Sequence, residues 1–326
     1  MPQLEYKVKQ KVGRKKGNNM IYTCTMNPAI DLFTEFEQFS PFVVNRSNFE
    51  DYQANGKAIN ISFMLKKLNI DSTATGFLGG FTGKYIEEEL VRNSIDVNFI
   101  KVDGITRINT FIRSGELEYK AVNKGPEINR NAQEALLQYI KTFTNEDMLF
   151  VSGSLPKGVE DDIFMTIAKL SQEQGFSLVL DISSAKLIDC LPYHPYLIKP
   201  NDEELAHLLG VPNLESEQEL VKAAQQLLDR GAERILVSRG EKGALYVDEQ
   251  HILWTTAPKG KVVNTACAGD TMLAVFVGKM IQTGNLEEAL IFATAAGSST
   301  AFTAGLSNLE DIPLLRKQIQ LKKGVI

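Results

Sequence analysis

Residues 264–272 read Asn-Thr-Ala-Cys-Ala-Gly-Asp-Thr-Met, a turn of small residues that delivers a single aspartate, Asp270. Hydrophobic residues follow at 273–277, as expected if a helix begins near Ala268. Backbone N–H groups at a helix start lack partners and carry the positive end of the helix dipole, so they can bind an anion. An aspartate beside such a pocket is a candidate base for a hydroxyl that attacks phosphorus. An ordinary helix cap has the same local sequence, so the surrounding chain must decide.

Around this turn, short apolar runs alternate with amphipathic stretches. The apolar runs predict buried strands at 21–25, 74–78, 148–152, 177–181, 196–198 and 234–238. Helical periodicity predicts helices at 59–68, 85–93, 132–143, 163–174 and 218–230. This alternation is typical of a doubly wound α/β fold with a mostly parallel sheet, whose binding sites lie beyond the carboxyl ends of the strands. The stretches 36–52 and 99–122 lack helical periodicity and fit short strands, an edge hairpin or a loop insertion.

Composition agrees with a large globular domain. The chain has 326 residues, 44% of them hydrophobic, and can bury a substantial core. A net charge of −5 argues against a general nucleic-acid binder, and there is no apolar run long enough to span a bilayer and no secretory pattern at the start. The three cysteines and three histidines lack metal-site spacing. We therefore expect a cytoplasmic protein with neither a disulfide framework nor a metal cluster.

Residues 1–19 differ from the rest, with six basic residues and one acidic residue. Such a tail could touch nucleic acid or a membrane, but we expect a disordered or appended extension. The folded domain is then expected at 20–326.

Two segments of the first half carry polar residues suited to a sugar. Asp31 follows the first predicted strand, where a carboxylate can accept hydrogen bonds from sugar hydroxyls; a plain turn aspartate is the alternative. Residues 54–60 read Ala-Asn-Gly-Lys-Ala-Ile-Asn and bring Gly56, Lys57 and Asn60. Lysine can bind a phosphate, and asparagine can bond hydroxyls as donor and acceptor. A Gly-Lys pair also occurs at helix starts by chance.

These segments resemble signatures of the PfkB (ribokinase-like) carbohydrate kinases. Residues 264–270 resemble D/N-[ST]-x-G-A-G-D, with Cys267 in place of the first glycine and Ala268, Gly269 and Asp270 retained. Residues 54–60 resemble G-G-K-G-x-N, with Asn55 and Ala58 replacing glycines. Asparagine tolerates a positive φ better than most residues, whereas cysteine does not adopt one cheaply. The resemblance implies a ribokinase-like fold whose stretches 36–52 and 99–122 form a small β-sheet lid over the sugar.

Two further segments resemble the phosphosugar branch of this family. Residues 106–109 resemble the T-R-I-N of 1-phosphofructokinases, and Arg107 with Asn109 would bind the phosphosugar. Residues 151–158 resemble G-S-L-P-x-G, in which Ser154 would present its hydroxyl to a phosphate. The alternatives are a solvated arginine on an edge strand and an ordinary Gly-Ser turn.

The donor-side motifs come later in the chain. Lys199 resembles the lysine of the family's K-P-N, and Asn201 with Glu204 resembles its N-x-x-E, which would hold Mg²⁺ through water. Acidic residues in a first helical turn are also favoured by the dipole alone. The family's nucleotide loop, S-x-G-x-x-G, is represented by Ser238, Gly240 and Gly243.

Together the motifs imply phosphorylation of fructose 1-phosphate at O6 by ATP with Mg²⁺. In this hypothesis Asp270 is the base, the amides of residues 268–270 bind the transferring phosphoryl group, and Arg107 with Lys57 binds the existing phosphate. Asp31 and Asn60 would orient the ketose. The alternatives are a tagatose-6-phosphate kinase and a catalytically weak sensor, which only the three replaced glycines favour. A nicotinamide oxidoreductase is disfavoured because no G-x-G-x-x-G follows the first strand. Expected partners are the phosphosugar, ATP and a second copy paired through the lid, with neither nucleic acid nor membrane.

Overall fold

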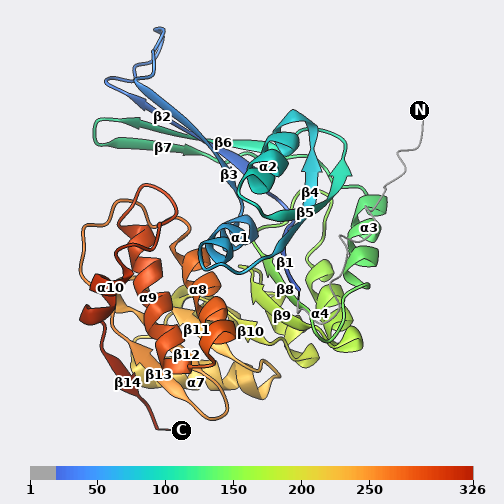
Figure 1. The fold of residues 1–326 in the computed structure, drawn as a ribbon, viewed down its shortest axis with the longest axis vertical. Coiled ribbons are helices and arrows are strands. Elements are labelled where there is room, and N and C mark those ends of the chain that lie inside the picture. The colour runs from blue at the N-terminus through green and yellow to red at the C-terminus, as the bar shows by residue number, and fades with distance from the viewer. Residues whose placement is uncertain (1–19, 326) are drawn as a thin grey trace.

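The computed structural model describes residues 20–325, and the extension expected at 1–19 lies outside this range. Within it, a large sheet runs in the order β14-β13-β12-β11-β10-β9-β8-β1-β4-β5, and a smaller sheet in the order β3-β2-β6-β7 (Figure 1). The strands from β5 to β11 pair in parallel, whereas β12, β13 and β14 add an antiparallel edge. The expected doubly wound fold with a small extra sheet is confirmed.

The strands of the large sheet match the apolar runs of the sequence. They are β1 (Ile21–Thr25), β4 (Thr73–Gly79), β5 (Asp96–Val102), β8 (Met148–Ser152), β9 (Ser177–Asp181), β10 (Leu197–Ile198), β11 (Ile235–Ser238), β12 (Ala244–Val247), β13 (Ile252–Thr255) and β14 (Leu321–Lys323). Each of the six predicted strands is found to within one residue at either end. The antiparallel edge was not expected, because its short strands carry no periodic pattern of their own.

Helices cover both faces of this sheet. They are α1 (Lys57–Lys67), α2 (Gly80–Arg92), α3 (Arg130–Ile140), α4 (Asp162–Gln174), α5 (Leu187–Cys190), α6 (Asp202–Leu208), α7 (Glu217–Asp229), α8 (Ala268–Thr283), α9 (Leu286–Ala301) and α10 (Ile312–Leu315). Strand β8 shows how the layers form, since its successive side chains point to opposite faces. Leu149 and Val151 belong to the core that includes residues of α3, α4 and α7, and Phe150 belongs to the core that includes residues of α1, α8 and α9.

The small sheet, which we call the lid sheet, projects from the body of the molecule (Figure 1). It consists of β2 (Ala29–Phe36), β3 (Phe49–Asn55), β6 (Arg107–Ser114) and β7 (Leu117–Ala121). Strands β6 and β7 lie within the expected stretch 99–122 and β3 overlaps the stretch 36–52, whereas β2 almost entirely precedes it. Strand β2 begins earlier, directly after the turn that follows β1, and residues 37–48 form the connection to β3. Residues 96–102 pair with β4 instead, because their apolar side chains complete the large sheet.

No helix in the part of the chain from 20 to 325 combines the length and the apolar character that crossing a bilayer requires.

Candidate active site

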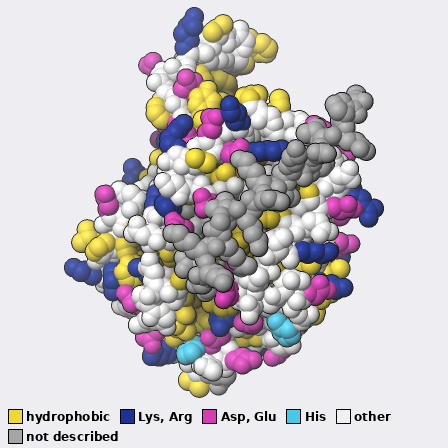
Figure 2. Space-filling view, turned by 45° about the vertical axis from the view of Figure 1, so that its right-hand side comes forward, with side chains coloured by type: hydrophobic (Ala, Val, Ile, Leu, Met, Phe, Trp, Pro, Cys, Tyr) yellow, Lys and Arg dark blue, Asp and Glu magenta, His cyan; other side chains and the backbone are white. Residues whose placement is uncertain are grey.

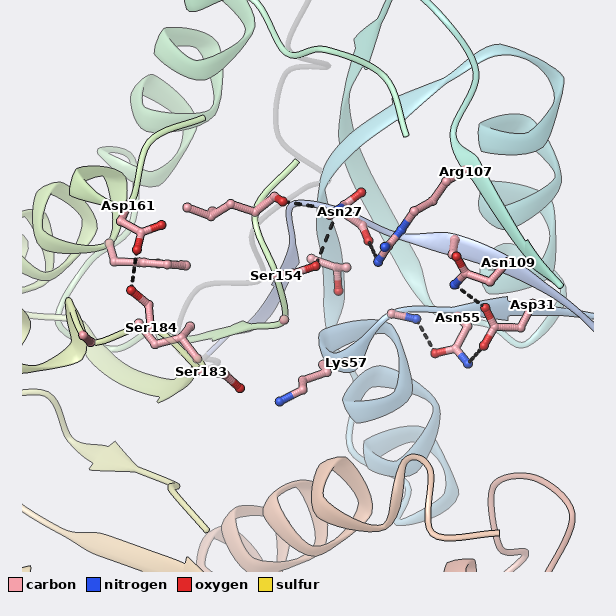
Figure 3. Close-up of a pocket in the computed structure, with 18 residues that line it drawn as sticks. Asn27, Asp31, Asn55, Lys57, Arg107, Asn109, Ser154, Asp161, Ser183 and Ser184 are labelled. Carbon is pink, nitrogen blue, oxygen red and sulfur yellow. Dashed lines mark hydrogen bonds between the residues drawn. The ribbon is translucent and has the colours of Figure 1, made fainter. Parts of the chain in front are cut away.

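The carboxyl ends of the parallel strands form one edge, where most of the sequence-predicted sugar residues meet. A cavity of about 590 Å³ opens there, between this edge and the base of the lid sheet. Six of the seven predicted substrate residues line it: Asp31, Gly56, Lys57, Arg107, Asn109 and Ser154 (Figure 3). The seventh, Asn60, lies behind this wall in α1 and is buried. The fold thus brings together side chains that are more than 120 residues apart in the sequence, such as those of Asp31 and Ser154.

Asp31 is held by two amides, one from each neighbouring strand. Asn109 stands opposite Asp31 in the pairing of β2 with β6, and its Nδ2 donates to Asp31 Oδ1 at 2.8 Å. Asn55, at the end of β3, donates from Nδ2 to Asp31 Oδ2 at 2.6 Å. Burial raises the pKa of Asp31 above its ordinary value, and Asn109, Arg107 and Asn55 oppose that rise. The result is an oriented carboxylate facing the cavity (Figure 3).

Asp270, the candidate base, is buried at the start of α8 and is reached by Asn60 from α1. Asn60 Nδ2 lies 2.9 Å from Asp270 Oδ2, 3.0 Å from Asn55 Oδ1 and 3.2 Å from Cys267 Sγ. Burial, followed by the negative charge of Asp181, raises the pKa of Asp270 to about 6, against the opposing effects of Asn60 and two lysines. A carboxylate with a pKa in this range can hold a proton during turnover near neutral pH.

The turn before α8 leaves the start of the helix without a side-chain cap. The helix begins at Ala268, as expected, and Cys267 occupies the N-cap position with φ +63° and ψ −2°. Cys267 therefore takes the left-handed conformation that a glycine would adopt without strain. The amides of the first turn have no partners within the helix. Burial raises the pKa of the Cys267 thiol to about 12, so this side chain stays protonated and packs as a neutral group.

Asp181, which sequence reasoning did not single out, lies between two lysines at the end of β9. Its Oδ1 is 3.1 Å from Lys199 Nζ and 3.5 Å from Lys57 Nζ. Burial alone would raise the pKa of Asp181, but Lys199 and Lys57 outweigh burial and hold it below its ordinary value. The sequence does contain one signal for Asp181, which is a carboxylate at the end of a predicted buried strand. Asp31 was singled out because it follows such a strand.

Lys57 and Arg107 line the same cavity but point to different groups (Figure 3). Lys57 faces Asp181, and its positive charge also reaches Asp270, the candidate base. Arg107 donates to the carbonyl oxygens of Asn27 at 2.7 Å, Asn123 at 3.1 Å and Pro28 at 3.4 Å. These bonds use three of its five N–H groups and leave two for a ligand.

A second cavity, of about 660 Å³, opens beside the start of α8, and two of the residues expected to bind a nucleotide, Ser238 and Gly240, line it. Ser238, Gly240, Ala268 and Gly269 line it together with residues 257–260 and part of α9. A Cβ atom on Gly269 would lie 3.3 Å from Lys199 Nζ, so this glycine lets the lysine approach the turn. Asp181 links the two cavities, because Lys57 of the first cavity and Lys199, which lies beside Gly269 of the second, both pair with it.

Gly243 and the Asn201–Glu204 pair have structural roles that the sequence motifs do not reveal. Gly243 has φ +93°, and a Cβ there would lie 1.9 Å from the carbonyl oxygen of Thr255. This glycine allows β12 to start against β13 and does not line the 660 Å³ cavity. Asn201 and Glu204 form a capping box on α6, with Glu204 N to Asn201 Oδ1 at 2.7 Å and Asn201 N to Glu204 Oε2 at 2.9 Å. Glu204 Oε1 accepts from Ser183, so each carboxylate oxygen keeps one lone pair for a metal-bound water.

Comparisons with known proteins show which family and which fold this chain resembles. The model of the pfkB family carbohydrate kinases matches residues 24–312. The D-tagatose-1-phosphate kinase of Bacillus licheniformis is 54% identical over 93% of this chain and 99% of its own length. The 1-phosphofructokinase of Bacillus subtilis is 34% identical over 93% of this chain and 100% of its own length. The tetrameric inhibited form of phosphofructokinase-2 from Escherichia coli superposes with a TM-score of 0.84 at 28% identity, covering 92% of this chain and 98% of the other.

Proposed function

This chain belongs to the pfkB family of carbohydrate kinases, and we propose that it transfers the γ-phosphoryl group of ATP to O6 of a ketohexose 1-phosphate. The relative that is named a tagatose-1-phosphate kinase favours D-tagatose 1-phosphate as the acceptor. Fructose 1-phosphate, which the T-R-I-N motif favours, is the second candidate and is supported by the relative named 1-phosphofructokinase. The observation that carries the proposal is Asp270, a carboxylate with a pKa of about 6 that is buried in the first turn of α8, where Ala268 and Gly269 line the 660 Å³ cavity.

In the proposed reaction, Asp270 accepts the proton of the O6 hydroxyl as O6 attacks the γ-phosphorus. The O6–P bond forms, the bond from phosphorus to the bridging oxygen of ADP breaks, and the proton remains on Asp270. The first-turn amides of α8 face the phosphoryl group as its charge redistributes, and fixed dipoles of this kind stabilise such a transition state. Lys57 and Lys199 supply positive charge on the same side, and Asp181 holds both ammonium groups in position.

The sugar would bind in the 590 Å³ cavity with its ring hydroxyls toward Asp31 and Asn109. The phosphate on C1 would then reach the two free N–H groups of Arg107, with Ser154 and Lys57 as neighbouring donors on the same wall. Buried polar groups that lose their partners are costly, so this wall can discriminate between sugar hydroxyl configurations.

ATP would bind in the 660 Å³ cavity, beside Ser238, Gly240 and Gly269. The Oδ2 atom of Asp181 is buried and has no hydrogen-bond partner within residues 20–325, which fits a site completed by a cationic ligand. Glu204 and Asn201 would hold Mg²⁺ through water, using the free lone pairs of Glu204. The metal ion, when bound, would neutralise charge on the nucleotide phosphates.

We also propose that two copies pair through the lid sheet and that the protein acts in the cytoplasm. Figure 2 shows hydrophobic side chains on this projecting part of the molecule, mixed with charged ones. Phe49, Tyr52, Leu117 and Tyr119 of the lid sheet are each about half exposed, which is a large apolar surface for a single copy. The three cysteines are unpaired, as is usual in a reducing compartment. Sedimentation velocity of the wild-type chain and a Tyr119→Glu variant would test the pairing, because a monomer in both would contradict it.

The activity is tested by ADP release with Mg-ATP and a panel of acceptors: tagatose 1-phosphate, fructose 1-phosphate, tagatose 6-phosphate and fructose 6-phosphate. We expect turnover to be highest on a ketohexose 1-phosphate and to fall about a thousandfold in Asp270→Asn, with ATP affinity retained. Preference for a 6-phosphate would move the site of transfer to O1 and contradict the assignment of O6. Binding without turnover on any acceptor would favour the sensor alternative.

A further inference from the structure

Asn55 stands where the family signature has a glycine, and its side chain makes bonds that glycine cannot make. Its Nδ2 donates to Asp31 Oδ2 at 2.6 Å. Its Oδ1 accepts from the backbone N–H of Gly56 at 2.6 Å and from Asn60 Nδ2 at 3.0 Å. Asn60 in turn contacts Asp270. Asn55 thus joins the carboxylate of the sugar wall to the start of α1 and, through Asn60, to the candidate base.

The hydrogen-bonding capacity of Asn55 and Asp31 shows which donors and acceptors remain for a ligand. Both lone pairs of Asn55 Oδ1 are used, whereas Nδ2 has a second N–H beyond the one given to Asp31, and within the protein this N–H has only the weakly accepting thiol of Cys267 as a partner. Asp31 Oδ1 accepts from Asn109 and Oδ2 accepts from Asn55, so each oxygen keeps one site. Both side chains line the 590 Å³ cavity. A sugar hydroxyl at this wall therefore meets a donor and an acceptor side by side.

We propose that Asn55 determines which of two ketohexose 1-phosphates, differing in the configuration of one ring hydroxyl, the enzyme prefers. This inference rests on the proposed function. A hydroxyl on the ring face toward the wall donates to Asp31 while it accepts from Asn55. In the epimer that hydroxyl points away, and both wall groups lose a partner in a buried site. Sites that hydrogen-bond a hydroxyl discriminate strongly for this reason.

The space behind Asn55 gives this position a second effect. A separate cavity of about 420 Å³ lies under the lid sheet, and Asp31 and Asn55 line it as well as the sugar cavity. Phe33, Tyr52 and Phe63 form part of its remaining wall. Asn55 is therefore part of the partition between the two spaces. Glycine at this position opens the partition and admits water, which can satisfy a hydroxyl of either configuration.

The test compares kcat/KM for tagatose 1-phosphate and fructose 1-phosphate in the wild type and in Asn55→Gly. We expect the wild type to prefer one of the two epimers. In Asn55→Gly, the ratio of the two kcat/KM values should move at least tenfold toward unity. A wild-type ratio within threefold of one, or a ratio that Asn55→Gly leaves within threefold of its wild-type value, would overturn the proposal. Absence of turnover on either sugar by the wild type would instead contradict the proposed function, and this inference with it.

A matched control separates selectivity from loop geometry. Cys267→Gly restores another of the missing glycines and removes the contacts of the thiol with Asn60 and Asn55, but Cys267 makes no hydrogen bond to Asp31. This variant should change kcat on both sugars by the same factor. Asn55→Ala removes the same amide without adding glycine's freedom, and it serves if the glycine variant does not fold. Equal losses on both sugars in Asn55→Ala and Asn55→Gly would assign Asn55 a purely structural role.

Discussion

Changing Asp181 to asparagine should lower the free energy of unfolding of the ligand-free protein by about 3 kcal/mol. Asp181 is the shared partner of Lys57 and Lys199, and its own carboxylate is almost fully buried. Asparagine has nearly the same shape, so packing is preserved and the change is electrostatic. The variant leaves two positive charges facing each other without the carboxylate that balances them.

The size of the effect follows from the exposure of each lysine. The Lys199 side chain is 5% exposed, so it cannot recover the lost interaction from water. Breaking a buried ion pair by removing one partner costs about 3–5 kcal/mol. Lys57 is 37% exposed and can turn to solvent, where such pairs contribute about 0–1 kcal/mol. The expected loss in the free energy of unfolding is therefore about 3 kcal/mol, the lower end of the range for buried ion pairs.

The assay is urea unfolding at pH 7, with stability obtained by linear extrapolation. Asp71→Asn is the matched control, since Asp71 also pairs with a lysine, Lys66 at 2.8 Å, but is 86% exposed. We expect the control to lose less than about 1 kcal/mol. Mg-ATP should stabilise Asp181→Asn more than the wild type, if its phosphates supply the missing negative charge to the lysines.

The same variant makes a prediction about pH. The negative charge of Asp181 helps to raise the pKa of Asp270, so its removal should lower that pKa from about 6. Because the base must be deprotonated, the acidic limb of kcat/KM should move to lower pH. A stability loss below about 1 kcal/mol at unchanged urea dependence, or an acidic limb that stays in place or moves up, would refute this account of the site's charges.

Three further substitutions test the start of α8. Asn60→Ala removes a bond that lowers the pKa of Asp270, so the acidic limb of kcat/KM should move above pH 6; a limb that stays near 6 would contradict this. Gly269→Ala places a Cβ 3.3 Å from Lys199 Nζ and should raise KM for ATP severalfold with little change in melting temperature, whereas an unchanged KM would remove this turn from the nucleotide site. Cys267→Gly removes the strain of a non-glycine residue with a positive φ, which is worth about 1 kcal/mol, but it increases the conformational entropy of the unfolded chain, at a cost of similar size. Its urea stability should therefore stay within about 0.5 kcal/mol of the wild type, and a larger loss would mean that the thiol contact to Asn60 matters more than the strain.

Sequence patterns predicted those parts of the molecule whose signals are local. Buried strands are recognised by their apolar runs, and the rule that sites lie at strand ends is sufficient to predict a site at Ser154, directly after β8. Asp31 was expected at the end of the first strand but lies in β2 of the lid sheet, because the chain turns into that sheet directly after β1. The antiparallel edge was missed for the converse reason. Strand β14 lies more than 60 residues beyond β13, its pairing partner, and contains two lysines, so no local pattern connects the two.

The side-chain network of the candidate site was beyond sequence reasoning for a different reason. That Asn109 meets Asp31 depends on the register between β2 and β6, and a shift by one residue would turn Asn109 to the other face. That Asp181 balances two lysines depends on α1 and β10 reaching the same edge. Neither relation can be read from the residues on one segment, although each residue type suited its role.

Two of the residues that replace glycines of the family signature, Asn55 and Cys267, contact the same side chain. Asn55 and Cys267 both approach Nδ2 of Asn60, the group that also donates to Asp270. That nitrogen carries two hydrogens, so three acceptors compete for them. A weaker acceptor at either replaced position leaves a larger share of the donation to Asp270, which lowers the pKa of the base. Residues 55 and 267 therefore belong to the same hydrogen-bond network as the candidate base, with Asn60 as the shared donor, and a change at either position should be felt at Asp270 through Asn60.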